Sequence, residues 1–179
     1  MSRCAGVVLT GGASRRMGTD KAFVVVDGRP MAIAVADALW EAGCQPVECQ
    51  GGDLAGLASL GLHGFADEYP DGGPADAIRV ASARHDAPIL VVACDLPDVD
   101  AAAVTAVLDA GSEHDRLAVA VADGRPHLLA YVPAGTIVGP VVGRPLHEVF
   151  ADAIEVPIDV AAIRNVNAPD DLPPDGSDR

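Results

Sequence analysis

An apolar segment at residues 5–9 runs directly into a loop of glycine and basic residues, and this junction most constrains the fold. The loop reads Leu9-Thr10-Gly11-Gly12-Ala13-Ser14-Arg15-Arg16-Met17-Gly18-Thr19-Asp20-Lys21. Glycine lets backbone N–H groups approach an anion closely, and basic side chains neutralise its charge. We therefore expect a first buried strand that ends at a phosphate-binding loop. The alternative is an ordinary glycine turn with solvated basic side chains.

The loop also holds the only lysine of the chain, Lys21, whereas the chain has eleven arginines. An ammonium group is a compact point charge, whereas a guanidinium group is a planar fork. The single lysine therefore indicates a position that needs a point charge. The loop matches neither the Walker A pattern nor the GxGxxG pattern, so the usual phosphate-binding motifs do not identify the ligand.

Beyond the loop, apolar runs alternate with helix-like segments, which predicts an α/β fold with a mostly parallel sheet. Strands are expected at residues 5–9, 46–49, 62–66, 88–93, 116–122, 128–132 and 154–158, and helices at 30–40, 74–84, 100–108 and 143–150. An Asp-Gly turn between two of the strands predicts a small antiparallel hairpin. The strand at 154–158 contains a proline and is expected at an edge. We expect one domain over residues 1–172 and a disordered tail over 173–179.

The net charge of −14 argues against nucleic acid as a partner, because binding to nucleic acid needs a basic surface. No apolar run approaches the roughly 18 residues of a membrane span, and no leader peptide is expected ahead of the first strand. The four cysteines lack zinc-site spacing, so we expect buried free thiols in a cytoplasmic protein. A phosphate-bearing substrate would then need local cations or a metal.

Asp95 follows the most apolar predicted strand, residues 88–93, and Pro97 ends that strand. Ligands of open α/β sheets bind at the carboxyl ends of the strands. A carboxylate placed there can hold Mg²⁺, which takes few protein carboxylates and fills its other positions with phosphate oxygens and water. The alternative is an aspartate that only caps a turn.

Two further segments are candidates for binding. Asp67 precedes a loop of turn residues at 70–74, whose glycines would allow a flat ligand to approach. Asn165 and Asn167 are one strand period apart and so share a face. The alternative for the loop at 70–74 is an ordinary surface loop. The alternative for the two asparagines is that their amides only satisfy buried backbone groups. The five histidines show no metal-ligand spacing, and His127 is kept as a weak candidate because it follows a turn into a buried strand.

Taken together, the motifs resemble those of the molybdenum cofactor guanylyltransferases, within the wider nucleotidyltransferases. The resemblance covers residues 5–172 and is carried by four stretches, which are the loop at 9–21, Asp67 before the proline- and glycine-rich loop at 70–74, Cys94-Asp95-Leu96-Pro97, and Asn165-Val166-Asn167-Ala168-Pro169-Asp170-Asp171-Leu172. It implies a three-layer, Rossmann-like α/β fold. It also implies an Mg²⁺-dependent enzyme that transfers GMP from GTP to the terminal phosphate of molybdenum-bearing molybdopterin and releases pyrophosphate.

The resemblance also implies residue roles. The implied nucleotide-binding residues are Leu9, Thr10, Gly11, Gly12, Lys21, Asp67 and Asp95. The implied catalytic residues are Arg16, Lys21 and Asp95, and Asp95 is also the implied metal ligand. Asn165 and Asn167 are the candidates on the acceptor side. Arg16 and Lys21 would hold the triphosphate, and Asp67 would contact the nucleoside. A labile product implies hand-over to a molybdoenzyme or its chaperone.

The chain departs from the family pattern at several positions. Thr10 stands where alanine is usual, Gly51-Gly52 where many members have asparagine, and Ala168 where threonine is usual. Asp76 would place a carboxylate near the nucleotide. These changes leave the choice between GTP and CTP open. Two alternatives therefore remain, which are a cytidylyltransferase for the same cofactor or another phosphorylated metabolite, and a non-catalytic nucleotide-binding module.

Overall fold

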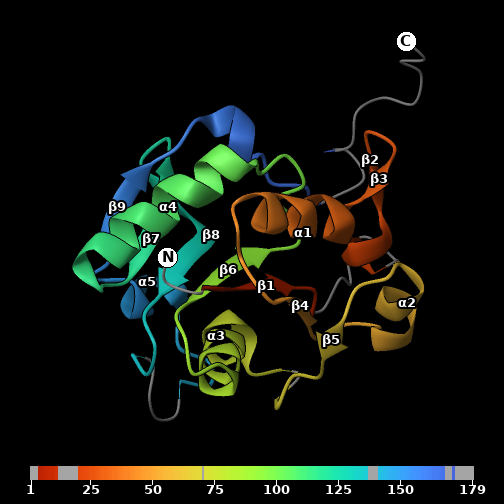
Figure 1. Ribbon diagram of the computed structural model, residues 1–179, viewed down its shortest axis with the longest axis horizontal. Helices are drawn as coiled ribbons and strands as arrows, with labels where there is room; N and C mark the ends of the chain where they lie inside the picture. Colours follow the sequence, from red (N-terminus) through yellow and green to blue (C-terminus); the bar gives the residue numbers. More distant parts are fainter. Residues whose placement is uncertain (1–3, 12–19, 70, 137–140, 168–170, 172–179) are drawn as a thin grey trace.

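A seven-stranded sheet runs through the middle of the computed structural model, which describes residues 4–11, 20–69, 71–136, 141–167 and 171 (Figure 1). The strand order is β5-β4-β1-β6-β8-β7-β9. The strands are β1 (Ala5–Leu9), β4 (Val47–Gln50), β5 (Gly64–Phe65), β6 (Ile89–Ala93), β7 (Ala118–Ala122), β8 (Arg125–Val132) and β9 (Ile154–Pro157). A separate antiparallel pair joins β2 (Val25–Val26) to β3 (Arg29–Pro30).

Helices cover both faces of the sheet, so the expected three-layer α/β architecture is confirmed. They are α1 (Met31–Glu41), α2 (Leu54–Ser59), α3 (Gly73–Arg84), α4 (Ala101–His114) and α5 (Leu146–Val149), with 3₁₀ turns η1 (Lys21–Phe23) and η2 (Val160–Ile163). Figure 1 shows α1 and α4 on one side of the sheet and α3 on the other. Val8 of β1 packs into the cluster under α1 and α4, whereas Val7 and Leu9 pack with Ile78 of α3.

The central strands are parallel and buried on both faces. β1 pairs with β4 on one side and with β6 on the other, and all five of its residues are buried. Such strands carry continuous apolar runs because neither face meets water. The expectation of a buried strand at each of these positions is confirmed.

The predicted hairpin is also confirmed, and it is built into the sheet. β8 is antiparallel to both β6 and β7, and β9 adds to the outer side of β7 in parallel. Asp123 and Gly124 make the turn with φ of 48° and 69°, which suits a tight two-residue hairpin. Because β8 runs opposite to β6, its first residues lie beside the carboxyl end of β6.

Several expected boundaries are wrong. The strand expected at 62–66 is reduced to two residues in β5, and the helix expected at 143–150 to the four residues of α5. Pro30 belongs to β3 and precedes α1, because its ψ of 137° is extended. The turn at 169–172, apart from Asp171, and the tail at 173–179 lie outside the described residues.

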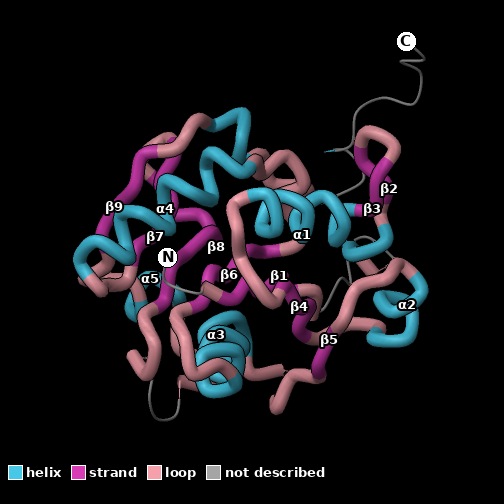
Figure 2. The backbone as a smooth tube through the Cα atoms, viewed as in Figure 1, coloured by secondary structure: helices cyan, strands magenta, loops and turns pink. Residues whose placement is uncertain are grey.

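One helix was not expected. Figure 2 shows α2 as a separate short helix beside β5. Asp53 caps it, accepting hydrogen bonds from the backbone N–H groups of Ala55 and Gly56 at 3.1 Å each. The four cysteines are free and buried, as expected, and no helix in the described ranges is long and apolar enough to cross a membrane.

α4 continues six residues past the predicted end at Leu108, because Gly111 does not stop it. Asp115 ends the helix in the left-handed conformation with φ of 47°. Gly111 is buried, and an added Cβ there would meet the ring of Tyr131 and lie 2.8 Å from the Cβ of that tyrosine. Gly111 is therefore a packing position that lets α4 approach β8.

Gly111→Ala tests this packing. Alanine favours a helix over glycine by about 1 kcal/mol, but overpacking a core costs about 1–3 kcal/mol. We expect a net loss of stability, measured as a lower midpoint of urea unfolding. Ser112→Ala, on the exposed side of the same helix, is the matched control and is expected to unfold at the original midpoint or slightly above it. A more stable Gly111→Ala variant would contradict the assignment.

Candidate active site

A cavity of about 510 Å³ opens where β1, β4 and β6 end and β8 begins. Ligands of parallel α/β sheets bind at this edge. The structure brings Leu9, Thr10, Gly11, Lys21, Asp67, Asp95 and Asn165, all candidate site residues from the sequence, together on its lining. Sequence reasoning did not single out Gln50, Tyr69, Arg125 or Leu146, which also line the cavity, and it gave His127 only a weak role.

At one end of the cavity, two backbone segments and a carboxylate lie too close together for any side chain. A Cβ added to Gly11 or to Gly51 would meet Oδ2 of Asp67, and the one on Gly51 would also lie 2.6 Å from Cα of Gly11. Gly51 has φ of +77°, which glycine adopts without strain. The double glycine at the end of β4 therefore has a steric reason in this chain.

Gln50 lies under this end of the cavity and orients Asp67. The side chain of Gln50 is 1% exposed, and its Nε2 donates to Oδ1 of Asp67 at 3.0 Å. Its Oε1 is buried and has no hydrogen-bond partner among the described residues. Thr10 Oγ1 donates to the backbone oxygens of Gln50 and Gly51 at 3.0 and 2.8 Å. Gln50 Oε1 and the second Asp67 oxygen thus remain as acceptors.

The environment of Asp67 works against its charge. Burial raises the pKa of the Asp67 carboxyl, the hydrogen bond from Gln50 lowers it, and the nearby Asp76 raises it further. The net direction is upward. A carboxyl group with a perturbed pKa on the wall of a cavity is a candidate functional residue. It is therefore a candidate acceptor for hydrogen-bond donors of a ligand.

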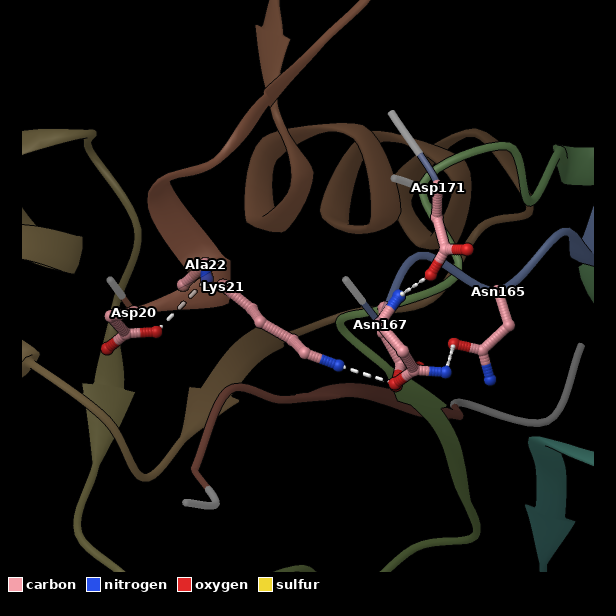
Figure 3. A network of polar contacts seen from close by, with 7 residues as sticks. Asp20, Lys21, Ala22, Asn165, Asn167 and Asp171 are labelled. Carbon is pink, nitrogen blue, oxygen red and sulfur yellow. Dashed lines mark hydrogen bonds and ion pairs between the residues drawn. The ribbon is translucent and has the colours of Figure 1, made fainter. Parts of the chain in front are cut away.

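Lys21 lies at the centre of the site, at the start of η1. Asp20 caps this turn by accepting from the backbone N–H of Ala22 at 3.0 Å (Figure 3). Nζ of Lys21 donates to Oδ1 of Asn167 at 2.6 Å and lies 3.4 Å from Oδ2 of Asp95. The lysine of the first loop, the carboxylate after β6 and the last asparagine therefore meet at one point.

The segment at 165–167 is held against the end of β6. The backbone N–H of Val166 donates to the carbonyl oxygen of Asp95 at 2.9 Å, and Val166 is fully buried. Asn167 donates from Nδ2 to Oδ1 of Asn165 at 2.6 Å and from its backbone to Asp171 at 2.8 Å (Figure 3). The side chains of the two asparagines are thus joined by a hydrogen bond.

The expected site also includes Gly12, Arg16 and Asp76. Gly12 and Arg16 lie outside the described residues, so their roles stay predictions. Asp76, which is expected to place a carboxylate near the nucleotide, lies near enough to Asp67 to raise the pKa of that carboxyl but does not itself line the cavity. It is 1% exposed and its Oδ1 accepts from Nε of Arg79 at 2.8 Å. Arg79 also pairs with Glu68, so this cluster anchors the start of α3.

The predicted metal ligand stands alone. The described residues contain no group of three or more His, Cys, Asp or Glu side chains that could hold a metal ion. Asp95 offers one carboxylate, 23% exposed, on the cavity wall. This fits Mg²⁺ shared with the phosphates of a ligand, because that ion keeps several water molecules and needs only one or two protein carboxylates.

Comparison with known proteins gives one family. Residues 6–147 match the model of the MobA-like NTP transferase domain. A probable molybdenum cofactor guanylyltransferase of Synechococcus elongatus is 37% identical over 103 residues, 52% of this chain and 50% of that protein. A second, from Mycobacterium ulcerans, is 32% identical over 184 aligned positions, 94% of this chain and 91% of that protein. The chain is thus aligned with only about half the length of the first of these relatives.

Solved structures agree on the fold. Rv0371c of Mycobacterium tuberculosis superposes with a TM-score of 0.77 at 22% identity, covering 95% of both chains. Molybdopterin-guanine dinucleotide biosynthesis protein A of Archaeoglobus fulgidus does so with a TM-score of 0.72 at 22% identity, covering 94% of both. At this identity the likeness concerns the fold alone.

The upward shift in the pKa of Asp67 has a consequence for stability. The folded protein holds this proton to higher pH than the unfolded chain, whose value is near 3.8. Stability therefore falls as pH rises from that value through the raised pKa. Asp67→Asn keeps an oxygen to accept from Gln50, so we expect a higher melting temperature at neutral pH, with the difference shrinking as pH falls.

Thermal unfolding followed by circular dichroism, from neutral to mildly acid pH, measures this effect. Asp86→Asn is the matched control, because it removes an exposed carboxylate away from the cavity and reports the general benefit of reducing the −14 net charge. Asp67→Asn is expected to exceed that control. A melting temperature below that of the unmutated protein at neutral pH would show that the carboxylate stabilises the fold.

Proposed function

Because the chain belongs to the family of MobA-like NTP transferase domains, we propose that it transfers GMP from GTP to the terminal phosphate of molybdenum-bearing molybdopterin. An oxygen of the acceptor phosphate forms a bond to the α-phosphorus of GTP. The bond from that phosphorus to the bridging oxygen breaks, and pyrophosphate leaves with the electron pair. The names of the curated relatives support this choice of substrates. The meeting of Lys21 and Asp95 inside the cavity is the structural observation that carries it.

The nucleoside end of the cavity supports guanine. The Watson–Crick edge of guanine presents N–H donors at N1 and N2, whereas cytosine presents donors only at N4. Asp67 Oδ2 and Gln50 Oε1 are acceptors that no hydrogen bond between described residues occupies. Ribose hydroxyls can also donate to a carboxylate. Gly11, Gln50 and Asp67 line this end of the cavity, and Gly11 has no side chain that would keep a ring away from them.

The phosphate end supports nucleotidyl transfer. Lys21 supplies a positive charge, and Asp95 would hold Mg²⁺ between itself and the phosphates. When bound, this ion neutralises charge on the phosphate oxygens. Lys21 remains in place through Asn167 and needs no reorganisation as negative charge develops on the leaving group. Positioning and charge neutralisation account for most catalysis of such reactions, so no nucleophilic side chain is required.

Two wider expectations remain proposals. The four free buried cysteines support a cytoplasmic location, where thiols stay reduced. Hand-over of the product to a molybdoenzyme or its chaperone stays a prediction.

A pyrophosphate-release assay with each of the four nucleoside triphosphates tests the function. We expect release with GTP only, and only when both molybdenum-bearing molybdopterin and Mg²⁺ are present. Omitting the acceptor is the control for hydrolysis. Release with CTP in place of GTP would identify a cytidylyltransferase. Calorimetric binding of GTP without any release would identify a nucleotide-binding module and contradict the proposal.

Lys21→Met removes the ammonium group while keeping the length of the side chain. Loss of one preorganised charge at a developing anion lowers kcat by about 10²–10³. We expect a loss of that size with GTP and the acceptor at saturation, while circular dichroism stays unchanged. Arg29→Gln is the matched control, because it removes one exposed positive charge that pairs with Asp37 outside the cavity. Unchanged kcat in Lys21→Met would exclude a role for the lysine in transfer.

A further inference from the structure

The first four residues of β8 all line the cavity. These residues are Arg125, Pro126, His127 and Leu128. In a regular strand successive side chains point to opposite faces, so only alternate residues reach one side. Here the register of β7 against β8 shifts. Val119 pairs with Ala130, but the next residue, Ala120, pairs with His127. Such bulges bend a strand and redirect its side chains, often beside active sites.

The antiparallel direction of β8 brings this segment to the reaction centre. β6 pairs with β8 from Ile89↔Val132 to Val92↔Leu129, so the chain that follows β6 lies beside the start of β8. Asp95 therefore lies on one wall of the cavity, and Arg125 and His127 lie on the wall next to it. The nucleoside end, with Asp67 and Gln50, belongs to β4 and the segment after β5, on the other side of β1.

Arg125 is available to a ligand. It is exposed, and within the described part of the chain no hydrogen bond or ion pair engages its guanidinium group. Lys21, in contrast, already contacts Asn167 and Asp95. Most of the other described arginines pair with a carboxylate. A guanidinium fork matches a phosphate group with two parallel hydrogen bonds.

The surface around Arg125 suits a ligand with an uncharged body. Leu128 of β8 and Leu146 of α5 line the cavity there, together with Pro74 and Ala77 of α3. This apolar wall differs in chemistry from the glycines and acceptors that suit the nucleoside. The cavity therefore has two halves of different chemistry that share Lys21 and Asp95 between them.

From these observations we propose that Arg125, with His127 beside it, forms an anion subsite that holds the terminal phosphate of the acceptor. This inference rests on the proposed function and adds the residues that receive the second substrate. The guanidinium group binds two oxygens of the acceptor phosphate, which leaves the third oxygen to attack the α-phosphorus. Bond formation and departure of pyrophosphate then follow as described above. His127 donates a hydrogen bond to the same phosphate group.

Steady-state kinetics of Arg125→Ala tests the subsite. We expect KM for the molybdopterin acceptor to rise about ten- to a hundredfold, the range for loss of hydrogen bonds to a charged group. KM for GTP is expected to change by less than about twofold, within the scatter of surface substitutions. Arg125→Lys keeps the charge without the fork and is expected to recover part of the loss. His127→Asn is expected to show a smaller increase in the same parameter.

Arg144→Ala is the matched control, because it removes one exposed arginine that pairs with Glu148 on α5, close to but not lining the cavity. Its KM for the acceptor is expected to stay unchanged. An equal rise in KM for the acceptor in Arg144→Ala would show that the effect comes from net charge alone, and it would overturn the subsite. A larger rise in KM for GTP than for the acceptor in Arg125→Ala would assign the arginine to the triphosphate and also overturn it.

A binding measurement separates this inference from the proposed function. Titration of inorganic phosphate into the protein saturated with GTP, followed by ³¹P NMR, is expected to show binding that is lost in Arg125→Ala and retained in Arg144→Ala. If the unmutated protein releases no pyrophosphate with GTP and acceptor but this pattern holds, the proposed function fails and the anion subsite stands. Equal phosphate binding by all three proteins would overturn the subsite whatever the activity.

Discussion

Parallel pairing of β1 with β4 and β6 is the constraint on which the rest of the site depends. The ladder continues past the strands, because the N–H groups of Thr10 and Gly11 both donate to the carbonyl of Gln50 at 2.9 Å, and the N–H of Cys94 donates to that of Leu9 at 3.1 Å. A slip of one residue would turn the buried side chains of β1 to the wrong face, so the register is strongly specified. It delivers Gly11, the Gln50 amide and the Asp95 carboxylate to one edge of the sheet.

The same edge shows how an acidic protein can prepare a place for an anion. Two charged side chains face a ligand here, Lys21 at the phosphate end and Asp67 at the nucleoside end. The surrounding protein stabilises the charge of the first and opposes the charge of the second. Lys21 is paired, whereas Asp67 is held as a carboxylate in a place where burial opposes its charge. Proteins accept such local instability where the group serves a ligand. Asp76 is the contrast, because its burial is matched by Arg79 and serves the fold.

Sequence reasoning reached the layers, most strands and the cluster of loop, Asp95 and asparagines, because local patterns report buried strands and turns. It failed where the role of a residue depends on a partner that lies far away in the sequence. Gly111 looks like a helix stop, yet its role is set by Tyr131 on β8. Arg125 follows a simple turn, and only the antiparallel insertion of β8 brings it to the cavity. Asp53 is a local signal for the start of α2, because it caps the helix. The helix itself was missed because it has only six residues.

The contact between Lys21 and Asn167 explains why the segment at 165–167 belongs to the site at all. A lysine held mainly by a carboxylate would have its charge neutralised before a phosphate arrived. Here the shorter contact, 2.6 Å, is to a neutral amide oxygen, and the carboxylate of Asp95 lies further away at 3.4 Å. The amide fixes the position of the ammonium group and leaves its charge available. Val166 secures that amide by its burial and its bond to Asp95, so the last segment keeps the first loop preorganised for anions.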